Sequence, residues 1–300
     1  MPDSLPAISV QSSAQNTNSL GLVKAKDDKS LKSKSQQFLA AISFAGQVAM
    51  NNPSPVNPTS VQAQEQEKPD PLTVKITQEE HQEIIGKMVS YVNMPAGHLK
   101  SDDELYLEQQ LADMLGFEVT AELDGHRLNH TIGIMGSEQH LKRYPGDTLD
   151  QHDAYQEAGI APNRGAFGWF LESGELTKKA IEREKYYFAV QLMYLPDWNE
   201  NYPELKPWYK YRKMVVINPA EEVAVVGVVA DAGPAMWVKK QSGGSPEVIR
   251  EGKIWSPKTK GKVMLLFVDD PEDKIPLGPI SLKWEDKQQL ASQDNSFANK

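Results

Sequence analysis

The stretch EVAVVGVVADAGPAMW, Glu222 to Trp237, decides the fold class. Its valines favour a β-strand, and an apolar run with little alternation is typical of a strand that is buried on both faces. The run ends on a single acid, Asp231, and the chain then breaks at Ala232-Gly233-Pro234. An acid at the end of a buried strand is costly unless it caps the turn, pairs with a cation or has a chemical role. Asp231 is therefore our first candidate functional residue.

Three further runs have the composition of short buried strands. They are YYFAVQLMY at Tyr186–Tyr194, KMVVIN at Lys213–Asn218 and VMLLFV at Val263–Val268, each bounded by Pro, Gly, Asn or Asp. The residues after Asn218 predict a reversal into the strand that ends at Asp231, and SPEVIREG predicts a short helix with Pro at its N-terminus. We therefore expect a mainly β (α+β) domain over residues 121–285, built as a small closed barrel with short helices.

Residues 71–120 predict a small helical hairpin in front of this domain. Thr77 and Glu80 have capping-box spacing, as do Ser101 and Glu104. Each box is followed by apolar residues that recur on one helical face, and Gly116 is a natural C-cap. The apolar residues are Ile84, Ile85, Met88, Val89 and Val92 in the first helix and Leu107, Leu111, Met114 and Leu115 in the second.

The two ends of the chain have the composition of unfolded polypeptide. Residues 1–70 are rich in Ser, Gln, Asn, Pro and Lys and poor in aromatic residues, which predicts a disordered, low-complexity region. Residues 286–300 predict a polar tail. Within the first region, Lys24 to Lys34 precede QQFLAAISFAGQVAM, which has about the length of a signal-peptide core. Its Gln and Ser residues equally suit a short amphipathic helix or disorder. We expect the cell envelope or the exterior as the location, and the cytoplasm stays open as the alternative.

The composition of the chain excludes several classes of function. A net charge of −9 and a pI near 5.3 argue against nucleic acid as a partner, because nucleic-acid-binding proteins carry a basic stripe. The basic and aromatic run KPWYKYRK, Lys206–Lys213, is interpreted as the entry to a strand with solvated basic faces. No run reaches the roughly 18 apolar residues that an integral membrane span needs. The absence of cysteine excludes thiol chemistry, disulfides and Cys-ligated zinc.

Four of the six histidines fall between His126 and His152, together with several acids. Imidazole and carboxylate groups at this density indicate a metal site or an acid–base site, and the alternative is a set of histidines that serve only the core and the loops. Ser137, His140 and Asp147 have the S-x-x-H-x₆-D spacing of some zinc-dependent D,D-carboxypeptidases.

Those carboxypeptidases need a further downstream histidine, and this chain has none after His152. A zinc site would therefore have to recruit His126, His130 or His152, and the ligand set that we consider is His140, Asp147 and His152. The corresponding function is a zinc peptidase built on the His126–His152 cluster. In the metal-free alternative, Glu138 and His140 line a groove.

The segment IAPNRGAFGWF, Ile160 to Phe170, interleaves glycines with aromatic residues. Glycine lets a ligand or another chain approach the backbone, and aromatic faces stack on sugar rings or fill the core. The aromatic residues that we consider as sugar platforms are Phe167, Trp169, Tyr209 and Trp237. Core packing is the alternative for each of them.

The pattern VVINPAEEVAVVGVVADAGPA resembles the double-psi β-barrel domains of the rare lipoprotein A and expansin-like group. Those domains read approximately V-x-V-T-N-x-x-N-G-(K/R)-x-V-x-V-x-(I/V)-x-D-x-G-P, and the match runs from Val215 through Asn218 to Asp231, Gly233 and Pro234. The runs SPEVIREG and KVMLLFVDD stand where that group has a helix and its last barrel strand. The resemblance implies a six-stranded double-psi β-barrel, and it does not extend over residues 120–212.

Members of this group bind cell-wall glycan and in some cases cleave it. In the lytic transglycosylase members, a carboxyl group at the position of Asp231 protonates the glycosidic oxygen and then acts as a base, so no cofactor is needed. The resemblance therefore implies a bacterial cell-envelope protein that binds and cleaves peptidoglycan, with Asp231 as the catalytic acid and base. Glu138 and His140 are further catalytic candidates.

This chain departs from the pattern of the group at two places. Ala232 replaces the Arg that often follows the acid, and Gly244-Ser245-Pro246 replaces a D-L-S triplet, which removes an acid. A non-catalytic, expansin-like module that binds polysaccharide is therefore the alternative to an enzyme.

Overall fold

The computed structural model describes residues 76–152, 158–254 and 260–288. The predicted disordered region 1–70 lies outside these residues, and so does most of the polar tail predicted for 286–300. The predicted hairpin and barrel fall almost entirely within them.

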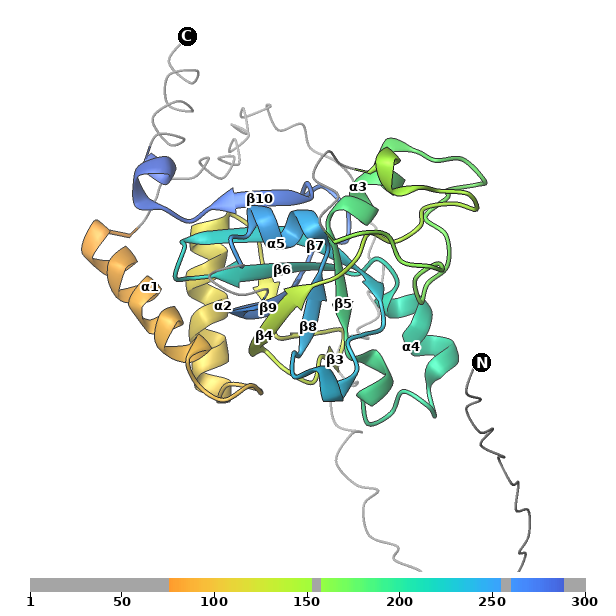
Figure 1. Cartoon of the computed structure of the whole chain (residues 1–300). Helices are drawn as coiled ribbons and strands as arrows, with labels where there is room; N and C mark the ends of the chain where they lie inside the picture. Colours follow the sequence, from red (N-terminus) through yellow and green to blue (C-terminus); the bar gives the residue numbers. More distant parts are fainter. Residues whose placement is uncertain (1–75, 153–157, 255–259, 289–300) are drawn as a thin grey trace, which may run out of the picture. The chain divides into compact units, whose positions relative to one another are not determined.

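Six strands close a mixed β-barrel (Figure 1). They are β4 (Ile132–Ser137), β5 (Tyr187–Val190), β6 (Lys213–Asn218), β7 (Val223–Asp231), β8 (Ser242–Gly244) and β9 (Lys260–Val268). Around the barrel the order is β9-β4-β8-β5-β7-β6, and β6 pairs with β9 again. The β4–β8 and β5–β7 pairs are parallel and the other four are antiparallel. The closed six-stranded barrel expected from the sequence is therefore confirmed.

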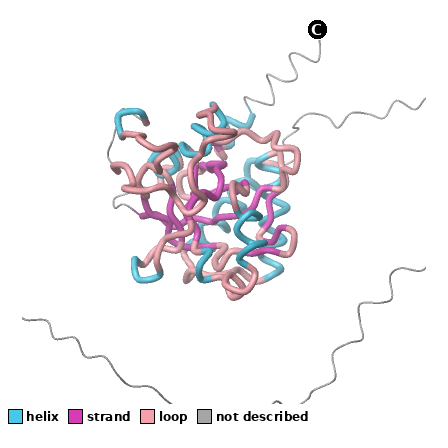
Figure 2. Tube along the Cα trace, turned by 90° about the vertical axis from the view of Figure 1, so that its right-hand side faces the viewer, coloured by secondary structure: helices cyan, strands magenta, loops and turns pink. Residues whose placement is uncertain are grey.

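Four further strands lie outside the barrel ring. β1 (Val119–Thr120) pairs with β9, and β10 (Gly278–Ser281) pairs with β7. β2 (Glu122–Leu123) and β3 (His126–Arg127) form a separate two-stranded ladder. Figure 2 shows the strands in the middle of the molecule with loops and short helices around them.

The barrel strands are apolar at nearly every position because both of their faces are covered. In β6, Met214 and Val216 belong to a core cluster to which β4, β5, β7 and β9 also contribute, which identifies it as the barrel interior. The alternate residues Val215 and Ile217 belong to a second cluster outside the barrel. Side chains alternate across a strand, so apolar residues are needed at every position.

The second cluster is completed by the helical hairpin. Helices α1 (Gln78–Val92) and α2 (Ser101–Leu115) lie side by side against the barrel (Figure 1). The capping box of Thr77 and Glu80 forms in both directions, and Gly116 ends α2 in the left-handed conformation. Both features confirm the sequence prediction.

The second predicted capping box does not form. Lys100 is the N-cap of α2, and Ser101 already lies inside the helix. The carboxylate of Glu104 accepts hydrogen bonds from Arg127 at 2.7 and 2.8 Å and from the Thr131 hydroxyl at 2.8 Å. A half-buried ion pair with Arg127 therefore occupies the carboxylate that the capping box would have used.

Three strand predictions change in the structure. The run Tyr186–Tyr194 gives only the four residues of β5 and then a 3₁₀ turn, η2 (Leu192–Tyr194). The run Lys206–Lys213 is not a strand entry, because Lys206 to Tyr209 are the last turn of helix α4 (Tyr202–Tyr209), with Pro207 inside it. The strand predicted to begin at Glu222 begins at Val223, because Glu222 has a left-handed φ of 52° in the turn after β6.

Two more helices cover the barrel, and two further 3₁₀ turns lie in its loops. Helix α3 (Lys178–Lys185) was not predicted, whereas α5 (Pro246–Glu251) confirms the helix expected from SPEVIREG, with Ser245 as its N-cap. The turns are η1 (Leu149–Gln151) and η3 (Met236–Val238). Among the helices of the described residues, none combines the length and the apolar character needed to cross a membrane.

Gly227 in the middle of β7 provides a test of the barrel packing. A Cβ atom at this position would lie 2.5 Å from the backbone oxygen of Tyr186 and 2.8 Å from the ring of Phe188. We expect Gly227→Ala to lower the free energy of unfolding by about 1–3 kcal/mol, because the backbone and ring must move apart. Urea unfolding monitored by circular dichroism measures the change.

Gly86→Ala in α1 is the matched control. No atom lies within 4 Å of a Cβ at that position, so the same substitution should stabilise the helix by up to about 1 kcal/mol. Equal unfolding curves for Gly227→Ala and the unsubstituted protein would contradict the close contact between β5 and β7.

Candidate functional site

The candidate site is a buried cluster of polar side chains between the loop after β4 and helix α3. We call it the His–carboxylate cluster; its members are His140, Arg143, Asp147, His152 and Glu184. The backbone on both sides of His140 is fixed, because its N–H donates to Gly159 O at 2.9 Å and its carbonyl accepts from Ala161 N at 2.8 Å. The histidine side chain is 0% exposed.

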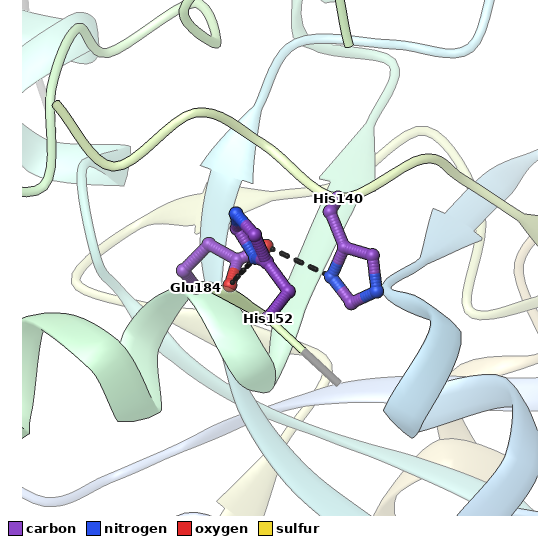
Figure 3. Close-up of side chains that lie close together, drawn as sticks. All are labelled: His140, His152 and Glu184. Atoms are coloured by element: carbon purple, nitrogen blue, oxygen red, sulfur yellow. Dashed lines mark hydrogen bonds and ion pairs between the residues drawn. The ribbon is translucent and has the colours of Figure 1, made fainter. Parts of the chain in front are cut away.

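Glu184 lies at the centre of the cluster, near the end of α3 (Figure 3). Its Oε1 is 3.3 Å from Nδ1 of His140, and its Oε2 is 2.9 Å from Nδ1 of His152. Oε1 also accepts the N–H of Leu141 at 3.1 Å. Burial opposes ionisation of Glu184, but the hydrogen bonds from the two histidines outweigh it and hold the pKa of Glu184 below its usual value.

Asp147 supports His152 from the other side. Its Oδ2 is 3.0 Å from Nε2 of His152 and accepts hydrogen bonds from the backbone N and from Nε of Arg143. Its Oδ1 accepts Nη2 of the same arginine at 3.1 Å. Burial opposes the charge of Asp147, yet the hydrogen bonds from Arg143 and the charge of His152 lower the pKa of Asp147 overall.

Each ring nitrogen of His152 faces a carboxylate oxygen, because Nδ1 lies 2.9 Å from Oε2 of Glu184 and Nε2 lies 3.0 Å from Oδ2 of Asp147. Arg143 supplies a positive charge beside Asp147. The hydrogen bonds to both carboxylates explain why this many polar groups are tolerated in the interior.

The cluster also has the composition of a metal site. His140, His152 and Glu184 offer ligand atoms that all lie within 4.8 Å of one another. Asp147, which the sequence prediction included as a ligand, instead contacts the far nitrogen of His152. Neither His126 nor His130 belongs to the cluster: His126 stacks on Trp208 at 4.2 Å, and His130 lines a small pocket near His98.

Asp231 lies at the end of β7 and is partly exposed. Its Oδ1 accepts the N–H of Ala166 and the N–H of Ala232, each at 2.9 Å. The second of these bonds is the turn cap that the sequence allowed. The first joins β7 to the segment Ile160–Phe170, so the two sequence features that resembled a glycan site lie against each other.

The charges of Glu138 and Asp231 act on Tyr187, as does the charge of Glu184 in the cluster. The Glu138 carboxylate pairs with Nζ of Lys240 at 2.7 Å, and its side chain lies against Gly243, where a Cβ atom would collide with it. Burial raises the pKa of Tyr187 far above its usual value, and the charges of Glu138, Glu184 and Asp231 add to the effect. The Tyr187 hydroxyl therefore stays protonated and donates to Gln139 O.

The four aromatic candidates differ in how much of each side chain reaches solvent. Trp237 is 80% exposed in η3, and Trp169 is partly buried. Phe167 and Tyr209 belong to the barrel core, so their rings offer no face to a ligand. Of these four candidates, Trp237 is the one whose ring lies largely in solvent.

Three members of the polar network were not foreseen from the sequence. They are Glu184, Arg143 and Glu247, whose Oε2 lies 3.9 Å from Nδ1 of His140. One signal was available for Glu184, because Ala180 and Glu184 are four residues apart and share a face of α3. An acid on the small apolar face of a short helix has to meet a partner inside the protein.

The lowered pKa values predict how stability depends on pH. A carboxylate with a lowered folded pKa stabilises the protein above the unfolded value, near pH 4, and this contribution is lost as the pH falls through the folded pKa. We expect the free energy of unfolding to fall as the pH is lowered from about 5 to about 2, and to fall less steeply in Asp147→Asn, with a chelator present throughout to exclude metal binding. Urea unfolding at each pH measures it.

Asp150→Asn is the control for this prediction, because Asp150 is exposed in the same loop. It should leave the pH profile of the unsubstituted protein unchanged. A profile of Asp147→Asn that matched the control would show that Asp147 is not ionised within the cluster.

Comparisons with known proteins identified no relative of this chain. No family model matches the chain, and no significant match was found among curated proteins or among solved structures. The function has to be argued from the residues themselves.

Proposed function

We propose that the protein binds polysaccharide through the surface that follows β7, and that peptidoglycan glycan strands are its ligand. The observation that carries the proposal is the exposure of Trp237. Tryptophan side chains are highly buried on average, so a ring that is 80% exposed is available to stack on a sugar. The adjacent Met236 is 62% exposed and Met94 is 48% exposed, which gives the same surface an apolar character.

A groove of about 470 Å³ lies at this surface and has room for sugar rings. Apolar groups line it, with Met94, Pro95 and Met236 among them, and Lys239, Gln241 and Lys262 supply polar atoms. Apolar faces together with a few polar groups suit a sugar, whose rings have apolar faces and hydroxyl edges.

The loop that carries Trp237 is held at both ends. The Gln191 amide donates to Pro234 O at 3.2 Å and to Lys240 O at 3.3 Å. Nζ of Lys240 donates to Glu138 and to Ser137 O. A platform that is anchored before the ligand arrives loses little entropy when the ligand binds.

The resemblance of the sequence to the rare lipoprotein A and expansin-like group supports the choice of ligand. The closed six-stranded mixed barrel is compatible with that group, and the finer double-psi topology is part of the proposal. A peptidoglycan ligand places the protein in the cell envelope or outside the cell.

Cleavage of the glycan is a second candidate function, and the position of Asp231 favours it. The residue is partly exposed at the end of a barrel strand, and its two hydrogen bonds both use Oδ1. Oδ2 can therefore exchange a proton with a glycosidic oxygen. Asp231 would be the catalytic acid and base, with Glu138 next in the same region.

Replacing Trp237 tests the binding proposal. We expect the full chain to sediment with insoluble peptidoglycan, Trp237→Ala to weaken this binding about 10-fold or more, and Trp237→Phe to retain most of it, because stacking needs an aromatic face. Quantified pull-down with increasing amounts of sacculi measures the affinity. If the unsubstituted protein stays in the supernatant with peptidoglycan, chitin and cellulose alike, the proposal is wrong.

Replacing Asp231 tests the cleavage candidate separately. A lytic enzyme would release 1,6-anhydro-muropeptides from purified sacculi, and Asp231→Asn would abolish this release while sedimentation with sacculi persists. Chromatography of the soluble products with mass detection measures it. Binding without any such product from the unsubstituted protein would leave the non-catalytic module as the function.

A further inference from the structure

We propose that His140, His152 and Glu184 bind one divalent transition-metal ion, with Zn²⁺ as the ion for the test. This inference comes from the buried His–carboxylate cluster and does not depend on glycan binding. The resulting site differs from the metal alternative of the sequence, because Glu184 takes the place of Asp147 among the ligands.

The donor atoms fit the coordination geometry of such an ion. Two imidazole nitrogens and one carboxylate are a common zinc ligand set, and ligand atoms of the three residues all lie within 4.8 Å of one another. Figure 3 shows both histidine rings in contact with the Glu184 carboxylate. The Nδ1 atoms of His140 and His152 lie 3.3 and 2.9 Å from the two oxygens of Glu184. The edge of a zinc tetrahedron with bonds of 2.0–2.1 Å is roughly 3.3 Å. Both nitrogen–oxygen distances are close to that edge, so the two histidines and the carboxylate are near enough to share one ion.

The groups behind the ligands are those that a metal-bound histidine needs. Nε2 of His152 is 3.0 Å from Asp147, and Nδ1 of the same ring faces Glu184. A carboxylate on the far nitrogen fixes the ring and raises the basicity of the ligating nitrogen. Arg143 holds that carboxylate with three hydrogen bonds of 2.8 to 3.1 Å. Asp147 and Arg143 are therefore positioning residues.

A fourth oxygen lies close to the three ligands. Oε2 of Glu247, at the start of α5, is 3.9 Å from Nδ1 of His140, and its side chain is also buried. With this carboxylate the protein itself can supply a tetrahedral set, and a set without it leaves one position for water. Either arrangement keeps the ion inside the protein, because the side chains of His140 and His152 are 0% exposed.

The position of the site in the fold gives the ion a structural role. Two ligands, His140 and His152, come from the loop after β4, and Glu184 comes from α3. Glu184 is 44 and 32 positions away from these histidines in the chain. That loop also supports the segment beside Asp231, because Arg143 O accepts the N–H of Phe170 at 3.0 Å and Leu141 packs against Gly165. A bound ion would fix the loop to the helix and stabilise the folded state by mass action.

Zinc uptake by the full-length protein tests the site. The protein is stripped with a chelator, dialysed, and titrated with Zn²⁺ in competition with a chromogenic chelator. We expect one equivalent of tightly bound zinc, no tight binding in Glu184→Gln or His152→Gln, and about 10–100-fold weaker binding in Asp147→Asn. Zinc should also raise the melting temperature of the unsubstituted protein and of Asp147→Asn.

Two controls have the same chemistry at other positions. His126→Gln removes a histidine that stacks on Trp208, and Glu182→Gln removes an exposed acid from the same helix as Glu184. Both should retain one equivalent with unchanged affinity. Circular dichroism of every variant shows whether it is folded.

X-ray absorption of the zinc-loaded unsubstituted protein keeps the test decisive if Glu184→Gln and His152→Gln do not fold. It should show two imidazole ligands with oxygen in the remaining positions. A stripped, folded protein that binds no zinc, a spectrum without imidazole, or a loss of zinc in His126→Gln would overturn the assignment. The cluster would then be an ion-pair network alone.

Discussion

The architecture depends on covering β7 on both faces and along both edges. This nine-residue strand pairs with β6 along one edge, and with β10 and then β5 along the other. Its first half separates the barrel interior from the core under the helical hairpin. Near its end, Ala230 enters a third core with Leu141, Phe170 and Tyr187. Each neighbouring element buries one part of this strand. Without these elements, a strand of this composition would expose a large apolar surface.

The third core explains why charged groups can gather beside the barrel. It contains small residues such as Ala180, Ala189 and Ala230, so the loop after β4 and helix α3 approach β5 closely. The loop has polar backbone groups that need partners away from water, and Glu184 accepts one of them from Leu141. Once that carboxylate is buried it needs donors, and His140 and His152 supply them. The cluster follows from packing a loop against small residues.

The elements that follow from local sequence could be predicted. The valines of β7, the reversal after Asn218 and the box at Thr77 each depend on residues within a few positions of one another. The predicted cap at Asp231 has the same origin, because Ala232 is its neighbour. The hydrogen bond from Ala166 to Asp231 joins residues 65 positions apart, and no local pattern contains it.

Long-range partners account for the errors as well. Glu104 has the spacing of a capping acid, but Arg127 and Thr131 bind it more strongly than a helix terminus would. Residues 206–209 have the composition of a strand entry, yet Trp208 and Tyr209 pack as part of a helix against Phe267. Glu184 also depends on long-range partners, since His140 and His152 are 44 and 32 positions away in the chain. In each case a tertiary contact outweighs a local preference.

The two proposed sites share supports without sharing residues. Glu138 holds Lys240 at the base of the Trp237 loop, and two residues further on His140 is a member of the buried cluster. Asp231 is fixed through Ala166, whose neighbour Gly165 packs on Leu141. A change that loosens the loop after β4 would therefore disturb the surface around Trp237 through these contacts. Loss of Trp237 would leave the cluster intact, because the side chain projects into solvent.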